Sequence, residues 1–126
     1  MKRLIISFIL LAIVIISSFA VPIYVTSVTK DLVASIDGIE HSLNSDDIKT
    51  TQKKVIEFTN LWENKKETIT IFVNHGELDN ISYSNSKLLP LLKGNEKTQF
   101  IALLTKIKTI IIDVSRDELP NIGNIL

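Results

Sequence analysis

An apolar run close to the N-terminus constrains this chain more than any other feature of its sequence. Residues 4–28 carry no charged side chain, and most of them are Ile, Leu, Val, Phe or Ala. A run of this length can cross a bilayer as one helix, because about 20 residues span the hydrocarbon core. Lys2 and Arg3 precede the run, and basic residues favour the cytoplasmic side of a membrane. The sequence therefore predicts a single-pass protein of the cell membrane that contacts the lipid bilayer through residues 4–28, with its N-terminus cytoplasmic and its C-terminal domain extracytoplasmic.

A cleaved signal peptide is the alternative for this segment. Lys2 and Arg3 would form its charged start and residues 4–16 its apolar centre, and the small residues of Ser18-Phe19-Ala20 suit cleavage after Ala20. The apolar character continues beyond that site as far as Val25, which favours a retained anchor. Both alternatives export the rest of the chain. A buried core helix of a soluble protein is disfavoured, because the run is too long and too uniformly apolar.

The rest of the chain has the composition of one small domain. We divide the 126 residues into an anchor or signal peptide at 1–29 and an extracytoplasmic helical domain at 30–126. The chain has 14 basic and 14 acidic side chains, and this balance argues against a nucleic-acid partner, which requires a basic excess. The absence of cysteine excludes disulfides, thiolate metal sites and a cysteine nucleophile.

Apolar residues recur at helical spacing through the domain, which predicts an all-α fold. Turn residues at 44–47 and 93–95 separate the helices, and acidic residues at 46–47 suit a helix N-terminus. Short connections make neighbouring helices antiparallel, so we expect a small bundle of the helical-hairpin type. The stripes that predict its first, second and last helices are Val28, Leu32, Ile36, Ile39 and Leu43; Ile48, Val55, Phe58, Leu61 and Trp62; and Phe100, Leu103, Leu104, Ile107, Ile110, Ile111 and Val114.

The segment between the second and last stripes can be interpreted in two ways. Residues 68–73 are rich in β-branched side chains and favour a strand by propensity. Ile69, Phe72, Val73, Gly76, Ile81, Leu88 and Leu92 also fit one helical stripe. We favour the helix, with Gly76 and Pro90 as its weak points.

Residues 115–126 look like a tail that docks on the bundle through Leu119, Ile122, Ile125 and Leu126. An offset of 52 residues superimposes apolar positions of the second helix on the last, as two similar hairpins or any two amphipathic helices would.

Several segments of the chain resemble an uncharacterised bacterial family, domain of unknown function family 4363. They are the start at residues 1–6, Trp62 at the end of a helical stripe, the stretch at residues 72–79 and the C-terminal residues 124–126. The resemblance implies a short protein with one N-terminal membrane segment and a helical fold, and it implies no mechanism.

His75 and Asp79 form the one constellation that suggests chemistry. On a helix they lie four residues apart on one face, with Glu77 on the other side, and His41 with Asp37 forms a second such pair. Only if both pairs came together would a four-ligand metal site result, so we expect exposed helix-surface residues and no metal site. We place Trp62 in the core and expect Lys53-Lys54 and Lys65-Lys66 on solvated faces rather than on anionic lipid headgroups.

The chain has none of the common catalytic or phosphate-binding motifs, so we expect no enzyme, no catalytic residue and no cofactor. These features predict a membrane protein of unknown activity whose external domain binds another protein. The alternatives are an extracytoplasmic ligand or metal sensor that uses the His75 region, and a secreted helical protein released by signal-peptide cleavage.

Overall fold

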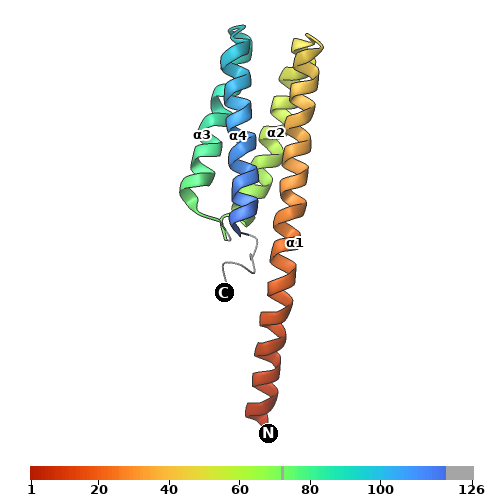
Figure 1. Cartoon of the computed structure of the whole chain (residues 1–126), viewed down its shortest axis with the longest axis vertical. Helices are drawn as coiled ribbons and strands as arrows, with labels where there is room; N and C mark the ends of the chain where they lie inside the picture. The colour runs from red at the N-terminus through yellow and green to blue at the C-terminus, as the bar shows by residue number, and fades with distance from the viewer. Residues whose placement is uncertain (72, 119–126) are drawn as a thin grey trace.

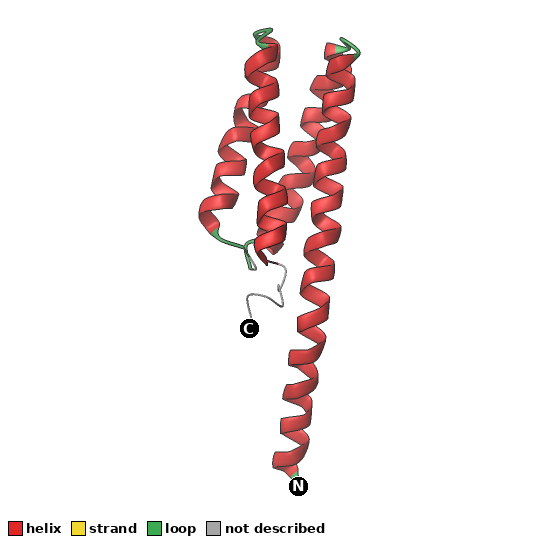
Figure 2. Cartoon of the chain, in the orientation of Figure 1, coloured by secondary structure: helices red, strands yellow, loops and turns green. Residues whose placement is uncertain are grey.

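The computed structural model describes residues 1–71 and 73–118, and all regular structure in these ranges is α-helical (Figures 1 and 2). The helices are α1 (Lys2–Asn44), α2 (Ile48–Ile69), α3 (His75–Lys93) and α4 (Lys97–Glu118). The predicted all-α class is confirmed.

The four helices form an antiparallel bundle from which the first half of α1 projects (Figure 1). α1 packs against α2 and α4, and α3 packs against the same two helices, so α1 and α3 lie at opposite corners. The two tight turns, α1–α2 and α3–α4, lie together at one end, which we name the distal end. The α2–α3 connection and the end of α4 lie at the other end, from which α1 projects; we name this the proximal end.

α1 runs without a break from the projecting segment into the bundle. Residues 1–20 are exposed, whereas Val25 and Val28 are only 5% and 4% exposed and belong to the buried interior. The bundle therefore starts within the apolar run at residues 4–28. Gly38 lies inside α1 without interrupting it, as the periodicity of the flanking residues predicted.

The predicted stripes supply most of the core. Trp62, Phe58 and Phe100 are among its largest fully buried side chains, which confirms the assignment of Trp62 to the core. The remaining buried members of the predicted first, second and last stripes are Val28, Leu32, Ile36, Ile39, Leu43, Val55, Leu104, Ile107 and Ile111.

The two tight turns have the same hydrogen-bonding pattern, offset by 49 residues. Asp46 and Asn95 both have φ of 57°, and their N–H groups donate to Leu43 O and Leu92 O at 3.0 and 3.2 Å. The buried positions follow the same offset, from Leu32 and Ile81 through to Trp62 and Ile111. The offset of 52 seen in the sequence does not match this register, because it compared helix stripes without fixing the turns between them.

The third segment differs from both interpretations of its sequence. α2 continues to Ile69, so residues 68 and 69 are helical, whereas the described residues 70, 71, 73 and 74 are neither helix nor strand and lie between α2 and α3. The physical reason is the cap at Asn74, which has an extended backbone and accepts a hydrogen bond from Gly76 N at 2.9 Å. Pro90 is in the last turn of α3, where few hydrogen bonds are lost.

The predicted tail starts too early. α4 extends to Glu118, so residues 115–118 are helical, and Ser115 is buried. Leu119, Ile122, Ile125 and Leu126 lie outside the described residues.

Candidate functional site

The structure keeps the two predicted histidine–carboxylate pairs apart. His75 and Asp79 lie in the first turns of α3 at the proximal end, and both are exposed. His41 is in the last turn of α1 at the distal end, and α1 does not pack against α3. Over residues 1–71 and 73–118 no three metal-ligating side chains come close enough to hold an ion. The four-ligand arrangement is therefore not formed.

Asp37 has a different partner from the predicted one. Its Oδ1 accepts a hydrogen bond from Lys108 Nζ at 2.7 Å, which ties α1 to α4 and raises the pKa of Lys108. His75 and Asp79 line an open hollow beside the end of α2, together with Lys66, Glu67, Thr70, Leu78 and Ser82. This hollow mixes charges of both signs, and its shape favours no particular ligand.

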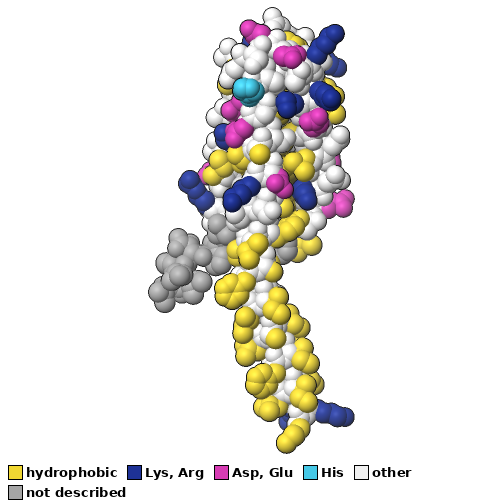
Figure 3. Space-filling view, turned by 90° about the vertical axis from the view of Figure 1, so that its right-hand side faces the viewer, with side chains coloured by type: hydrophobic (Ala, Val, Ile, Leu, Met, Phe, Trp, Pro, Cys, Tyr) yellow, Lys and Arg dark blue, Asp and Glu magenta, His cyan; other side chains and the backbone are white. Residues whose placement is uncertain are grey.

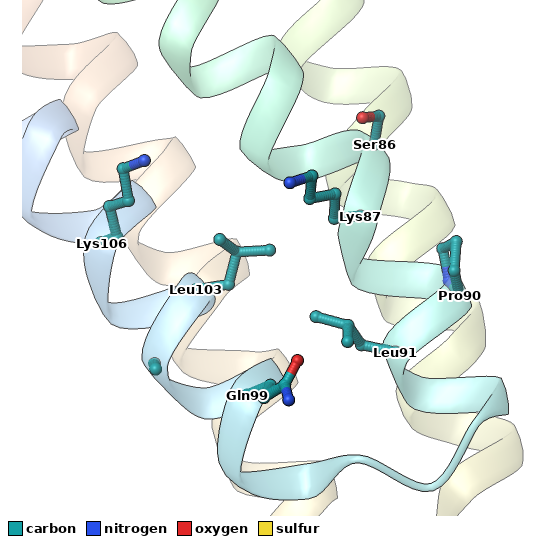
Figure 4. A pocket seen from close by; sticks show the side chains of 8 residues that line it. Ser86, Lys87, Pro90, Leu91, Gln99, Leu103 and Lys106 are labelled. Atoms are coloured by element: carbon teal, nitrogen blue, oxygen red, sulfur yellow. The ribbon is translucent and has the colours of Figure 1, made fainter.

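A larger groove lies between α3 and α4 on their outer side (Figure 4). Its volume is about 630 Å³. Leu91 and Leu103 are half-buried and provide an apolar surface between the helices. Residues that line the groove are Ser86, Lys87, Pro90 and Leu91 from α3 and Gln99, Ala102, Leu103 and Lys106 from α4.

One end of the groove is cationic. Lys87 and Lys106 extend toward each other from the two helices, and the described lining has no acidic side chain (Figure 4). Lys87 Nζ lies 4.4 Å from the centre of the Tyr83 ring, within the range of a cation–π contact. A hydrogen-bonding interaction with Lys87, and then the positive charges of Lys87 and Lys106, lower the pKa of the Tyr83 hydroxyl. An apolar surface that ends in two ammonium groups suits an amphipathic segment with acidic side chains.

Sequence reasoning missed this groove, although a signal for it exists. Lys87 and Leu91 are four residues apart, and Leu103 and Lys106 three apart, so each helix places a lysine and a leucine on one face. The pairing of α3 with α4 brings these two faces together, and helical periodicity alone does not specify that pairing.

The projecting part of α1 is the second candidate functional surface. Its most apolar stretch has a mean hydropathy of 3.0, and none of that stretch is buried in the protein. Figure 3 shows hydrophobic side chains over this part and charges of both signs over the bundle. By length and composition, α1 is compatible with a single-pass membrane anchor or with a signal sequence.

Comparison with family models gives a match to a domain of unknown function, DUF4363, over residues 19–125. The chain belongs to this family. The matched region takes in the whole bundle and starts in the exposed apolar part of α1. Comparisons with curated proteins and with solved structures found no match.

Proposed function

We propose that this DUF4363 protein is a single-pass membrane protein that holds a protein-binding bundle next to the bilayer. The observation that carries the proposal is the continuity of α1, whose first part is exposed and apolar while its second part belongs to the bundle core. Exposure of so many large apolar side chains to water is unfavourable, and a bilayer would remove them from water. The basic Lys2 and Arg3 before the apolar run favour a cytoplasmic N-terminus and an extracytoplasmic bundle.

We further propose that the α3–α4 groove binds an acidic amphipathic helix of a protein partner. A helix lying in the groove would cover Leu91 and Leu103 with its apolar face. Its acidic side chains would meet Lys87 and Lys106, so the charges would select the partner and set its direction. The proposal requires no catalytic group.

Photo-crosslinking from the groove in intact cells tests this function. A photoreactive residue replaces Ala102, which is exposed and lines the groove. We expect a crosslink to a partner peptide that contains both acidic and apolar residues. The charge reversals Lys87→Glu and Lys106→Glu together should reduce the crosslink several-fold, because they place negative charge where the acidic segment binds.

A matched control uses two lysines outside the groove. Lys49 and Lys53 are exposed on α2, and Lys49→Glu with Lys53→Glu changes the net charge by the same amount. This control should leave the crosslink unchanged. Equal losses in both double variants, or a crosslink to a second copy of this chain, would contradict the acidic-partner proposal.

A further inference from the structure

We propose that the bundle rests directly on the bilayer, and that Ile71 in the α2–α3 connection inserts into the lipid interface as a second membrane contact. The inference rests on the proposed membrane anchor and goes beyond it. An anchor alone requires only that α1 cross the membrane, whereas this proposal fixes the distance and orientation of the bundle relative to the lipid.

The position of Ile71 along the bundle follows from contacts at the proximal end. Val25 of α1 and Ile69 of α2 line the same small internal cavity, and the α2–α3 connection lies at the end of the bundle from which α1 projects (Figure 1). α2 runs toward the proximal end, and a turn carries its direction on to Ile71, whose N–H donates to Thr68 O at 3.2 Å. Ile71 therefore lies beyond Val25, at the level where α1 leaves the bundle.

The level of the lipid surface follows from the exposed length of α1. Large apolar side chains are exposed from Leu4 to Ile23, and a helix of that length spans about 30 Å, which matches the hydrocarbon core. The outer edge of the core then falls at Ile23. Tyr24 comes next, and tyrosine favours the boundary between lipid and water. Since α1 has no break between Ile23 and Val25, no linker separates the bundle from this edge.

Ile71 has the exposure that such a contact requires. It is 75% exposed, the highest value for a large hydrophobic side chain described in the bundle. Transfer of an isoleucine side chain from water into an apolar environment is favourable, so insertion of Ile71 would stabilise the contact.

Charge contributes little to this contact. Lys65 and Lys66 lie on α2 near the proximal end, but Lys66 pairs with Glu63 at 2.9 Å, and Glu67 is adjacent. This mixture gives no excess of positive charge toward anionic headgroups. We therefore expect the contact to form on zwitterionic phosphatidylcholine.

Depth measurement in vesicles tests the proposal, and the chain offers a convenient background because it has no cysteine. The variants Ile13→Cys, Ile71→Cys and Ile101→Cys are labelled with an environment-sensitive fluorophore in the full chain and reconstituted into phosphatidylcholine vesicles. All three side chains are exposed, so labelling preserves the core. Phosphatidylcholine carrying a spin label near its headgroup or deep in its acyl chain serves as the quencher.

We expect the label at position 71 to lose more than half its emission to the shallow quencher and to shift to shorter wavelength. Position 13, in the middle of the apolar segment, should respond most to the deep quencher. Position 101, in the first turns of α4 at the distal end, should respond to neither. If position 13 is quenched and position 71 behaves like position 101, the lipid contact is wrong and the anchor stands. If position 13 is not quenched, the anchor itself is wrong, and the contact with it.

Discussion

Trp62 holds α2 against α3 by both shape and polarity. Its side chain is 1% exposed, and its indole N–H donates to Ser82 Oγ at 2.8 Å. A second polar link between the same helices joins Asn85 Nδ2 to Thr59 Oγ1 at 3.0 Å. The core position of Trp62 could be predicted from its helical phase. Its hydrogen bond to Ser82, and the bond between Asn85 and Thr59, could not be predicted, because they depend on which helices pack together.

Trp62→Ala should therefore destabilise the full chain far more than His75→Ala. Loss of a buried aromatic side chain destabilises by about 3–5 kcal/mol, whereas changes at an exposed residue usually stay within about 0.5 kcal/mol. Urea unfolding in detergent micelles, followed by circular dichroism, measures both. Trp62→Phe should fold, with a free energy of unfolding between those of Trp62→Ala and His75→Ala. It retains most of the side-chain volume but leaves Ser82 without its hydrogen-bond donor. Greater damage from His75→Ala would show that its imidazole has a structural or ligand-binding role.

The Asp47 carboxylate makes the stability of the fold depend on pH. The Thr50 hydroxyl donates to Asp47 Oδ2 at 2.6 Å and Thr50 N–H to Oδ1 at 3.1 Å, and these bonds lower the pKa of Asp47 below its ordinary 3.8. The Lys97 ammonium, bonded to Asp46 Oδ1 at 2.6 Å, lowers the pKa of Asp46 in the same way. A carboxyl group whose pKa falls on folding stabilises the fold above its unfolded pKa, and this stabilisation is lost as pH falls through the folded value.

These two carboxylates should accordingly make the melting temperature fall as the pH drops below 3.8. Asp47→Asn keeps a capping side chain but removes the titrating group. The melting temperature of this variant should therefore fall less at acid pH than that of the unmodified protein. Asp31→Asn, an exposed change on α1, is the control and should follow the unmodified protein. Identical acid profiles for Asp47→Asn and the unmodified protein would contradict a stabilising role for this carboxylate.

Among the elements, apolar periodicity predicted the helices well but did not locate the boundary between α2 and α3. The β-branched residues 68–73 gave conflicting signals, while Asn74 followed by Glu77 three residues later is the pattern of a capping box. That pattern marks the start of α3 and would have located the break. The turn at 93–95 was predicted, but the sequence did not indicate that Asn95 rather than Gly94 takes the positive φ.

Gly38, in the interior of a helix, has room for a larger side chain. It lies inside α1, and a Cβ added there would approach Lys54 Nζ at 3.7 Å, an ordinary contact distance. Gly38→Ala should therefore stabilise the chain by about 0.5–1 kcal/mol, because alanine loses less backbone entropy on helix formation. Urea unfolding in micelles measures the change. A loss of stability would mean that this crossing of α1 and α2 needs the closer approach that glycine allows.

At the scale of the whole molecule, two similar hairpins combine around one shared core, and the first extends into the apolar segment. The sequence was sufficient to predict the helical class, the hairpin turns and the apolar segment. It did not specify the corner arrangement in which α1 faces α2 and α4, because amphipathic stripes do not encode which stripes meet. The α3–α4 groove depends on that arrangement, as does the separation of His75 from His41.

Fractionation of cells tests most directly whether α1 anchors the bundle and stays attached to it. Membranes from cells that make the full chain are washed with alkaline carbonate, and the intact mass of the protein is measured in each fraction. A retained anchor predicts that the protein stays with the membranes and begins at Met1 or Lys2. A soluble product beginning at Val21 would contradict it and would show that residues 1–20 are a cleaved signal peptide.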